Sequence, residues 1–201
     1  MNRTLKLLIA SDTLVFTGFG LISPILAVYI NDSISGGTIA AIGLMSTIFL
    51  VTKTIFQLLF SKIFQPKHRD LMVWIGTLLI AFVPIIYLLS NQIWHFYIAQ
   101  FIYGIGGGLA YPAWFSLFAS NLSKGKQGFE WSIYSGCVGI GAGAAAFIGS
   151  SIASSWGFPL TFFLSGIISI AGMIILLGLE KDNLKKILPS EIFVSKHKPA
   201  H

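Results

Sequence analysis

Charged residues and cysteine are both scarce in this sequence, and each scarcity excludes a class of protein. Charged residues make up 10% of the 201 residues, whereas a soluble domain carries about 25%. Hydrophobic residues make up 55% of the chain, so the sequence predicts an integral membrane protein. The single cysteine, Cys137, has no second cysteine with which to form an internal disulfide.

Groups that perform catalysis or bind metals are also scarce. All four histidines fall in predicted loops or in the C-terminal tail: His68, His95, His197 and His201. A membrane-embedded serine such as Ser165 therefore has no histidine base. No group of Cys, His and carboxylate residues has metal-ligand spacing, and the glycine-rich stretch 104–108 does not follow a predicted strand, which a nucleotide-binding loop requires. The sequence therefore predicts neither an enzyme nor a bound metal or cofactor.

Long apolar stretches fill most of the chain. A membrane-spanning helix needs about 20 apolar residues, because the hydrocarbon core is about 30 Å thick and each residue rises about 1.5 Å. Six windows reach this length: 7–30, 38–60, 71–89, 96–119, 131–154 and 159–179. The first is too long for the apolar core of a signal peptide, so we expect it to stay in the mature protein. The fold class predicted is an all-α membrane protein with six transmembrane helices.

Lysine and arginine fall on one side of these predicted spans. All but one of the 13 precede the first span, separate the second from the third or the fourth from the fifth, or follow the sixth. Cytoplasmic segments retain Lys and Arg, so we expect both termini in the cytoplasm of a cell with a plasma membrane or a bacterial inner membrane. The net charge of +6 then reflects membrane insertion and contact with anionic lipids, and we expect no binding of nucleic acid.

One phrase occurs in two of the spans. GFGLISP begins at Gly18 and ends at Pro24, and GGGLAYP begins at Gly106 and ends at Pro112. The first and fourth spans cross in opposite directions, so the phrase predicts two inverted three-helix repeats, 7–89 and 96–179, within a bundle over 1–179. The two phrases supply candidate residues for close packing and for bending of a moving helix: Gly18, Gly20, Pro24, Gly106, Gly108 and Pro112. Ordinary packing glycines and static kinks are the alternative.

The stretches that carry these phrases are similar to a known family. TGFGLISPILAVYI and AQFIYGIGGGLAYPAWFSLFA, together with the apolar text between and after them, resemble the N-terminal six-helix half of a major facilitator superfamily transporter from Leu7 to Leu179. Members of this family usually have twelve helices in two bundles. The resemblance implies that the first and fourth helices line the substrate cavity, that the second and fifth contact the other bundle, and that the third and sixth lie outside.

The family's signature motifs are altered here. In the loop SKIFQPKHRD only Arg69 matches the motif, and four positions depart from it: Ser61, Gln65, Pro66 and His68. Gln100 stands where the family often has Arg, and the exporter-type Gly-Pro pair reads Gly143 and Ala144. The charge latch of the family and membership of its antiporter group are therefore not expected.

Two ionisable residues lie inside predicted spans, and such residues are default candidates for function. Asp12 and Lys53 fall at similar depth on antiparallel neighbours. We expect an ion pair in which Asp12 takes and releases a proton while Lys53 stabilises its charged form in one conformation. The alternative is that Lys53 extends to the headgroups and Asp12 lies in the wet cytoplasmic end. Glu130, at the start of the fifth span, is expected to be interfacial.

Polar and aromatic residues share one face of the fourth span, because they are spaced by three or four positions: Gln100, Tyr103, Gly107, Tyr111 and Trp114. On the first span, Phe16, Phe19 and Ser23 share a face with Asp12. These faces predict a cavity for a neutral or amphipathic organic solute. A packing stripe is the alternative, because Tyr and Trp are common packing residues.

Three functions remain open from the sequence. The first is a secondary transporter of a small organic solute that works as a parallel homodimer within membrane lipids, because one six-helix bundle encloses no cavity between halves. The second is a half-length subunit or truncated product that needs a different partner. The third is a non-transporting membrane interaction protein. The basic tail, 180–201, is predicted to be cytoplasmic, as a surface helix around Leu184, Ile187 and Leu188 or as a disordered segment.

Overall fold

Six helices make up the fold. The computed structural model describes residues 1–63 and 69–187, and the side chains of residues 1–62 and 69–179. The helices are α1 (Arg3–Ser33), α2 (Ile39–Ile63), α3 (Arg69–Leu88), α4 (Ile93–Asn121), α5 (Gln127–Trp156) and α6 (Phe158–Ile187). Each of the six predicted windows coincides with one helix to within a few residues at each end, except that α6 continues further, so the all-α prediction is confirmed. The described residues contain no strand beyond an isolated bridge between Ser35 and Gln92.

Five of the described helices are long and apolar enough to span a membrane, and α4 is the exception. Gln100, the tyrosines and the glycines of α4 lower its mean hydropathy. Its 29 residues nevertheless match its neighbours in length, and α2 and α3 pack along it. We therefore interpret α4 as the sixth span, with its polar and small side chains covered by other helices rather than exposed to lipid.

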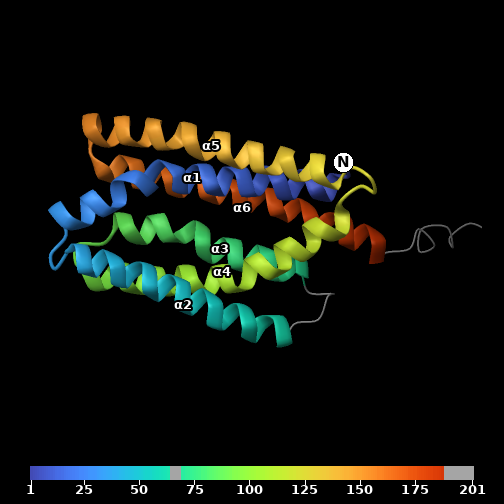
Figure 1. The fold of residues 1–201 in the computed structure, drawn as a ribbon, viewed down its shortest axis with the longest axis horizontal. Coiled ribbons are helices and arrows are strands. Elements are labelled where there is room, and N and C mark those ends of the chain that lie inside the picture. Colours follow the sequence, from blue (N-terminus) through green and yellow to red (C-terminus); the bar gives the residue numbers. More distant parts are fainter. Residues whose placement is uncertain (64–68, 188–201) are drawn as a thin grey trace, which may run out of the picture.

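The helices form two layers of three (Figure 1). α1 packs against α5 and α6 in one layer, α4 packs against α2 and α3 in the other, and α3 packs against α6 between the layers. The N-terminus, the α4–α5 loop and the C-terminal part of α6 lie at the same end of the bundle (Figure 1). Arg3, Lys124 and Lys126 lie at this end, so we expect it to face the cytoplasm.

The first glycine of each repeated phrase lies against the third helix of the other triplet. A Cβ on Gly18 would lie 2.8 Å from the carbonyl oxygen of Ser165 on α6, and a Cβ on Gly106 would lie 2.8 Å from the carbonyl oxygen of Gly76 on α3. The close approach at Gly18 also lets the buried Ser165 hydroxyl donate a hydrogen bond to the Gly18 carbonyl at 2.6 Å. Ser165 therefore has a structural role in helix packing.

The second glycine of each phrase lies against the second helix of the other triplet. A Cβ on Gly20 would lie 2.8 Å from the Ala142 carbonyl oxygen on α5, and a Cβ on Gly108 would lie 2.7 Å from Phe56 Cβ on α2. The two phrases thus make equivalent contacts, which is the pattern expected of an inverted repeat. Pro24 and Pro112 lie inside continuous helices, and their role in motion stays a prediction.

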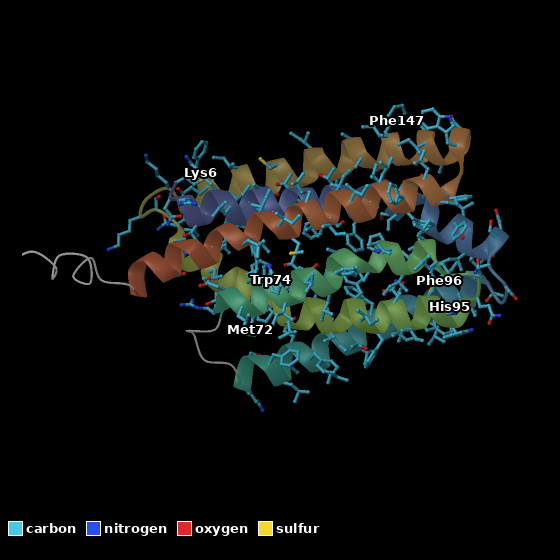
Figure 2. The ribbon with its side chains drawn as sticks, turned by 180° about the vertical axis from the view of Figure 1, so that it is seen from behind. Lys6, Met72, Trp74, His95, Phe96 and Phe147 are labelled. Atoms are coloured by element: carbon cyan, nitrogen blue, oxygen red, sulfur yellow. The ribbon has the colours of Figure 1, made fainter. Side chains whose placement is uncertain are left out.

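The helices on opposite sides of the bundle, α2 and α5, present apolar surfaces that the described part of the chain leaves uncovered (Figure 1). α2 and α5 expose large apolar side chains, including Leu58 at 62%, Ile140 at 77% and Phe147 at 78%. Figure 2 shows Phe147 pointing away from the bundle. In water such a surface would be strongly unfavourable, so it faces lipid or another membrane protein.

The predictions about the altered loop motif and about the tail concern residues that the structure does not describe. Gln65, Pro66 and His68 of the altered loop motif lie outside it, as do Leu188 and the following residues of the tail. The backbone of α6 continues as a helix to Ile187.

Candidate functional site

A cavity of about 350 Å³ lies between α1 and α4, with contributions from α3 and α5. Five residues predicted to line a cavity do line it: Phe16, Phe19, Ser23, Gln100 and Tyr103. They come from the middle and the C-terminal half of α1 and from the N-terminal half of α4. Because α1 begins at the end expected to face the cytoplasm and α4 begins at the opposite end, this cavity, here named the outer cavity, lies in the half of the bundle expected to face outward.

A buried hydrogen bond crosses the wall of the outer cavity. The Gln100 side-chain amide donates to the Tyr87 hydroxyl at 2.9 Å. Both side chains are buried, with exposed fractions of 9% and 1%. Tyr87 lies on α3 and was not among the predicted residues, because its own helix reads as a plain apolar span. The bond fixes the Gln100 side chain, so its carbonyl oxygen has a defined position beside the cavity.

Three aromatic rings separate the outer cavity from a second, smaller one. Tyr103 stacks on Phe19 of α1, with ring centroids 5.0 Å apart, and on Phe49 of α2, with centroids 4.3 Å apart. Three residues line both cavities, Phe16, Phe19 and Tyr103. The layer formed by Phe19, Tyr103 and Phe49, here named the aromatic layer, therefore joins α1, α4 and α2 across the middle of the bundle.

The smaller cavity, of about 20 Å³, holds the acidic candidate. Asp12 lines it together with Tyr111 and Trp114 of α4, so the stripe predicted on α4 is divided between the two cavities. The Asp12 carboxylate accepts a hydrogen bond of 2.6 Å from the Tyr134 hydroxyl on α5. Trp114 is buried, and its indole nitrogen has no hydrogen-bond partner among the described residues. This cavity thus combines a carboxylate with an unused donor.

The ion pair expected between Asp12 and Lys53 is not formed among the described side chains. The Lys53 ammonium instead lies 4.1 Å from the centre of the Tyr111 ring and 5.9 Å from that of Phe49, both cation–π contacts. The reason is helix packing: α2 packs along α4, whereas α1 packs along α5 and α6. Tyr111 therefore stands between the two charges, with its ring against Lys53 and a place in the cavity of Asp12.

Gly107 lies beside the contact between Lys53 and Tyr111 but lines neither cavity. A Cβ at this position would lie 3.2 Å from the Tyr111 ring and 3.5 Å from Lys53 Cγ. The absence of a side chain leaves room for the Lys53 stem beside Tyr111. Whether Gly107 contacts a substrate stays a prediction.

A second polar cluster closes the end of the bundle that is expected to face the cytoplasm. The Glu130 carboxylate accepts hydrogen bonds from the Ser123 backbone N–H at 2.7 Å and from its hydroxyl at 2.8 Å. It also lies 3.3 Å from the Met1 ammonium. The Asn2 amide donates to the Asn121 side-chain oxygen at 2.7 Å. Glu130 lies at the end of the bundle, as predicted, but it is buried and joins α1 to the α4–α5 loop.

No group of three or more His, Cys, Asp or Glu side chains in the described part of the chain could hold a metal ion. The candidate site therefore offers aromatic rings, one amide, a few hydroxyls, one carboxylate and one ammonium. These groups can bind an organic molecule and exchange a proton.

Comparisons with known proteins agree with the geometry of this bundle. Residues 8–198 match the model of the Major Facilitator Superfamily. An uncharacterized MFS-type transporter of Methanocaldococcus jannaschii is 25% identical over 158 residues, which cover 79% of this chain and 40% of that protein. The fold is similar to that of the POT family transporter PepTSo, with a TM-score of 0.74 and 15% identity, over 90% of this chain and 38% of that structure. The chain therefore spans about two fifths of the length of either protein.

Proposed function

The chain belongs to the major facilitator superfamily, and we propose on that basis that it is a secondary transporter that moves a small organic solute and works as a parallel homodimer. It is an integral multi-pass membrane protein. Its family favours transport over an enzymatic role. The observation that carries the proposal is the outer cavity, because residues predicted from two separate helices meet there, next to a carboxylate buried inside the membrane.

The placement of Asp12 supports a role in proton coupling. Its carboxylate is separated from the outer cavity only by the aromatic layer, so a change in its charge acts on the same residues that line the cavity. A charged carboxylate accepts the hydrogen bond from Tyr134, whereas a protonated one can also donate. Tyr111 lines the smaller cavity beside Asp12, and its ring also contacts the Lys53 ammonium. The charge of Lys53 therefore lies close to the cavity of Asp12. Protonation of Asp12 would thus alter contacts among α1, α4 and α5, and α1 and α4 carry the glycines and prolines predicted to bend a moving helix.

A substitution of Asp12 tests the coupling. We expect Asp12→Asn to abolish solute uptake driven by a pH gradient in proteoliposomes while exchange of solute across the membrane is partly retained, because the amide cannot carry the proton. Asp32→Asn is the matched control, since Asp32 lies exposed at the outer end of α1 and pairs only with Asn31 at 2.8 Å among the contacts described. Unchanged proton-driven uptake by Asp12→Asn would exclude the proton role.

The need for a second bundle supports the homodimer. A single six-helix bundle supplies one wall of a transport pathway, and the second wall must come from another bundle. α5 offers a flat surface for a partner helix, because three glycines on it have open space where a side chain would be: Gly136, Gly139 and Gly143. The same observations also fit a partner of different sequence that supplies the second wall.

Crosslinking between copies tests the dimer. Cys137 is exposed on α5, about 15 Å from the cytoplasmic end, and Thr54 is exposed on α2 at a similar depth. We expect Thr54→Cys to crosslink with Cys137 of a second copy in native membranes, and the purified chain to have the mass of a dimer in lipid nanodiscs. Phe82→Cys on the outward face of α3 is the control that should not crosslink. A monomer by both measurements would favour the partner of different sequence.

A further inference from the structure

We infer that the outer cavity takes a neutral, planar aromatic solute with a hydrogen-bond donor on one edge. The inference rests on the proposed function, because it treats this cavity as the substrate site. The site lies within one chain, however, so binding can be measured whether or not a dimer forms.

The neutrality of the solute follows from the charges around the cavity. No Asp, Glu, Lys, Arg or His side chain lines it. Asp12 lies behind the aromatic layer, hydrogen-bonded to Tyr134. Lys53 is held against Tyr111 and Phe49. A charged solute would lose its hydration on entering this cavity and would find no opposite charge in contact with it. Such a loss is strongly unfavourable inside a membrane protein.

The planar shape follows from the rings that line the cavity. Phe16 and Phe19 on α1, Tyr103 on α4 and Tyr87 on α3 surround a volume of about 350 Å³, which is within the range of small-molecule pockets. Aromatic pairs prefer offset-stacked or edge-to-face geometry and gain attraction beyond the area that they bury. A flat ring can therefore use several walls of the cavity together.

The scarcity of free polar groups argues against a sugar or another polyol. The Tyr87 hydroxyl already accepts a hydrogen bond from Gln100, and the Tyr103 hydroxyl interacts with that of Tyr111. Few polar partners remain on the cavity wall: the Gln100 amide, the Ser23 hydroxyl and the O–H donor of Tyr87. A molecule with a hydroxyl on each carbon would leave most of its hydroxyl groups without partners.

The donor on the solute follows from the fixed amide of Gln100. Its nitrogen donates to Tyr87, and its carbonyl oxygen forms no hydrogen bond with any residue that the structure describes. An acceptor in a fixed position on the cavity wall selects a ligand that brings a donor, since a bound ligand without one displaces water and leaves the acceptor unsatisfied.

Indole is a suitable probe, because it is neutral, planar and carries one N–H donor. We expect radiolabelled indole to bind saturably to the protein in lipid nanodiscs in equilibrium dialysis, after subtraction of its partition into empty nanodiscs. Unlabelled 1-methylindole should compete about five-fold less well than indole, the effect of one lost hydrogen bond. Tryptamine and indole-3-acetate, which add a positive or a negative charge to the same ring, should compete more weakly still.

Variants connect the binding to the amide. Tyr87→Phe should weaken indole binding less than the paired variant below, because the Gln100 carbonyl is still present although it loses the hydrogen bond that fixes it. The pair Gln100→Leu/Tyr87→Phe, which removes both partners and leaves no unsatisfied hydroxyl, should weaken binding about five-fold. Gln57→Leu, on α2 and away from both cavities, is the matched control.

The outcomes separate this inference from the proposed function. Absence of saturable indole binding, equal competition by tryptamine, or an unchanged affinity in the paired variant would each overturn it. Saturable binding by a chain that does not transport would leave the inference standing and count against the transporter. Proton-driven uptake of a charged solute by a protein that does not bind indole would support the transporter and overturn this inference.

Discussion

Replacing Gly20 with alanine tests whether the repeated glycines set the helix spacing. The added Cβ would lie 2.8 Å from the Ala142 carbonyl oxygen and 3.0 Å from its Cα, and both are backbone atoms that cannot rotate away. Overpacking of this kind costs about 1 to 3 kcal/mol, and contact with backbone favours the upper end. The gain in helix propensity from Gly to Ala offsets about 1 kcal/mol. We therefore expect Gly20→Ala to lower the free energy of unfolding by about 2 kcal/mol.

The measurement is thermal unfolding of the purified protein in detergent. A loss of about 2 kcal/mol in a chain of this length corresponds to a fall in Tm of roughly 4 to 8 °C. Gly108→Ala should behave similarly, because its Cβ would meet the α2 backbone, including the Gln57 nitrogen at 2.9 Å. Gly43→Ala on α2 is the control, since nothing lies near its Cβ, and it should be neutral or stabilising. If Gly20→Ala proved as stable as Gly43→Ala, the reasoning from close helix approach would be refuted.

Two further substitutions test the polar contacts of α5. Tyr134→Phe leaves the Asp12 carboxylate without its hydrogen-bond donor and should cost about 1 to 3 kcal/mol of unfolding free energy; the same change in an Asp12→Asn background should cost less, and additive costs in this double-mutant cycle would show that the two groups do not interact. Glu130→Gln should lower the Tm, because it weakens the contacts of the carboxylate with Ser123 and the Met1 ammonium. High salt should lower the Tm of the wild-type chain but not that of the variant, because only the wild type has the charge contribution. Equal Tm values for the two chains would contradict this prediction.

The sequence predicts the helices well because lipid imposes a simple rule on them. A run of about 20 apolar residues crosses the membrane whatever its neighbours are, so each window coincides with a helix. The faces of α1 and α4 were also predictable, since spacing by three or four residues determines which side chains share a face. Periodicity predicted the faces that carry Phe16, Phe19 and Tyr103, and the family resemblance implied that these two helices line one cavity, where the three residues meet.

The partners across the helices were not predictable from the same rules. Similar depth placed Asp12 beside Lys53, but depth does not tell which helices are adjacent, and α2 packs on α4. Tyr87 and Tyr134 become site residues only because α3 and α5 bring them to Gln100 and Asp12. Nothing in their own spans distinguishes them from ordinary packing tyrosines. The missing information is the order of helices around the bundle.

The exchange of neighbours between the two triplets has a consequence for biosynthesis. α1 emerges from the ribosome before α2 to α4, yet its main neighbours, α5 and α6, emerge after them. It must wait in the bilayer, apolar enough to remain there without them, while three other helices are made. α4, in contrast, finds α2 and α3 already present when it is inserted. A chain interrupted after α3 would thus contain a first helix without its main neighbours, and the nascent bundle closes only when its final segment arrives.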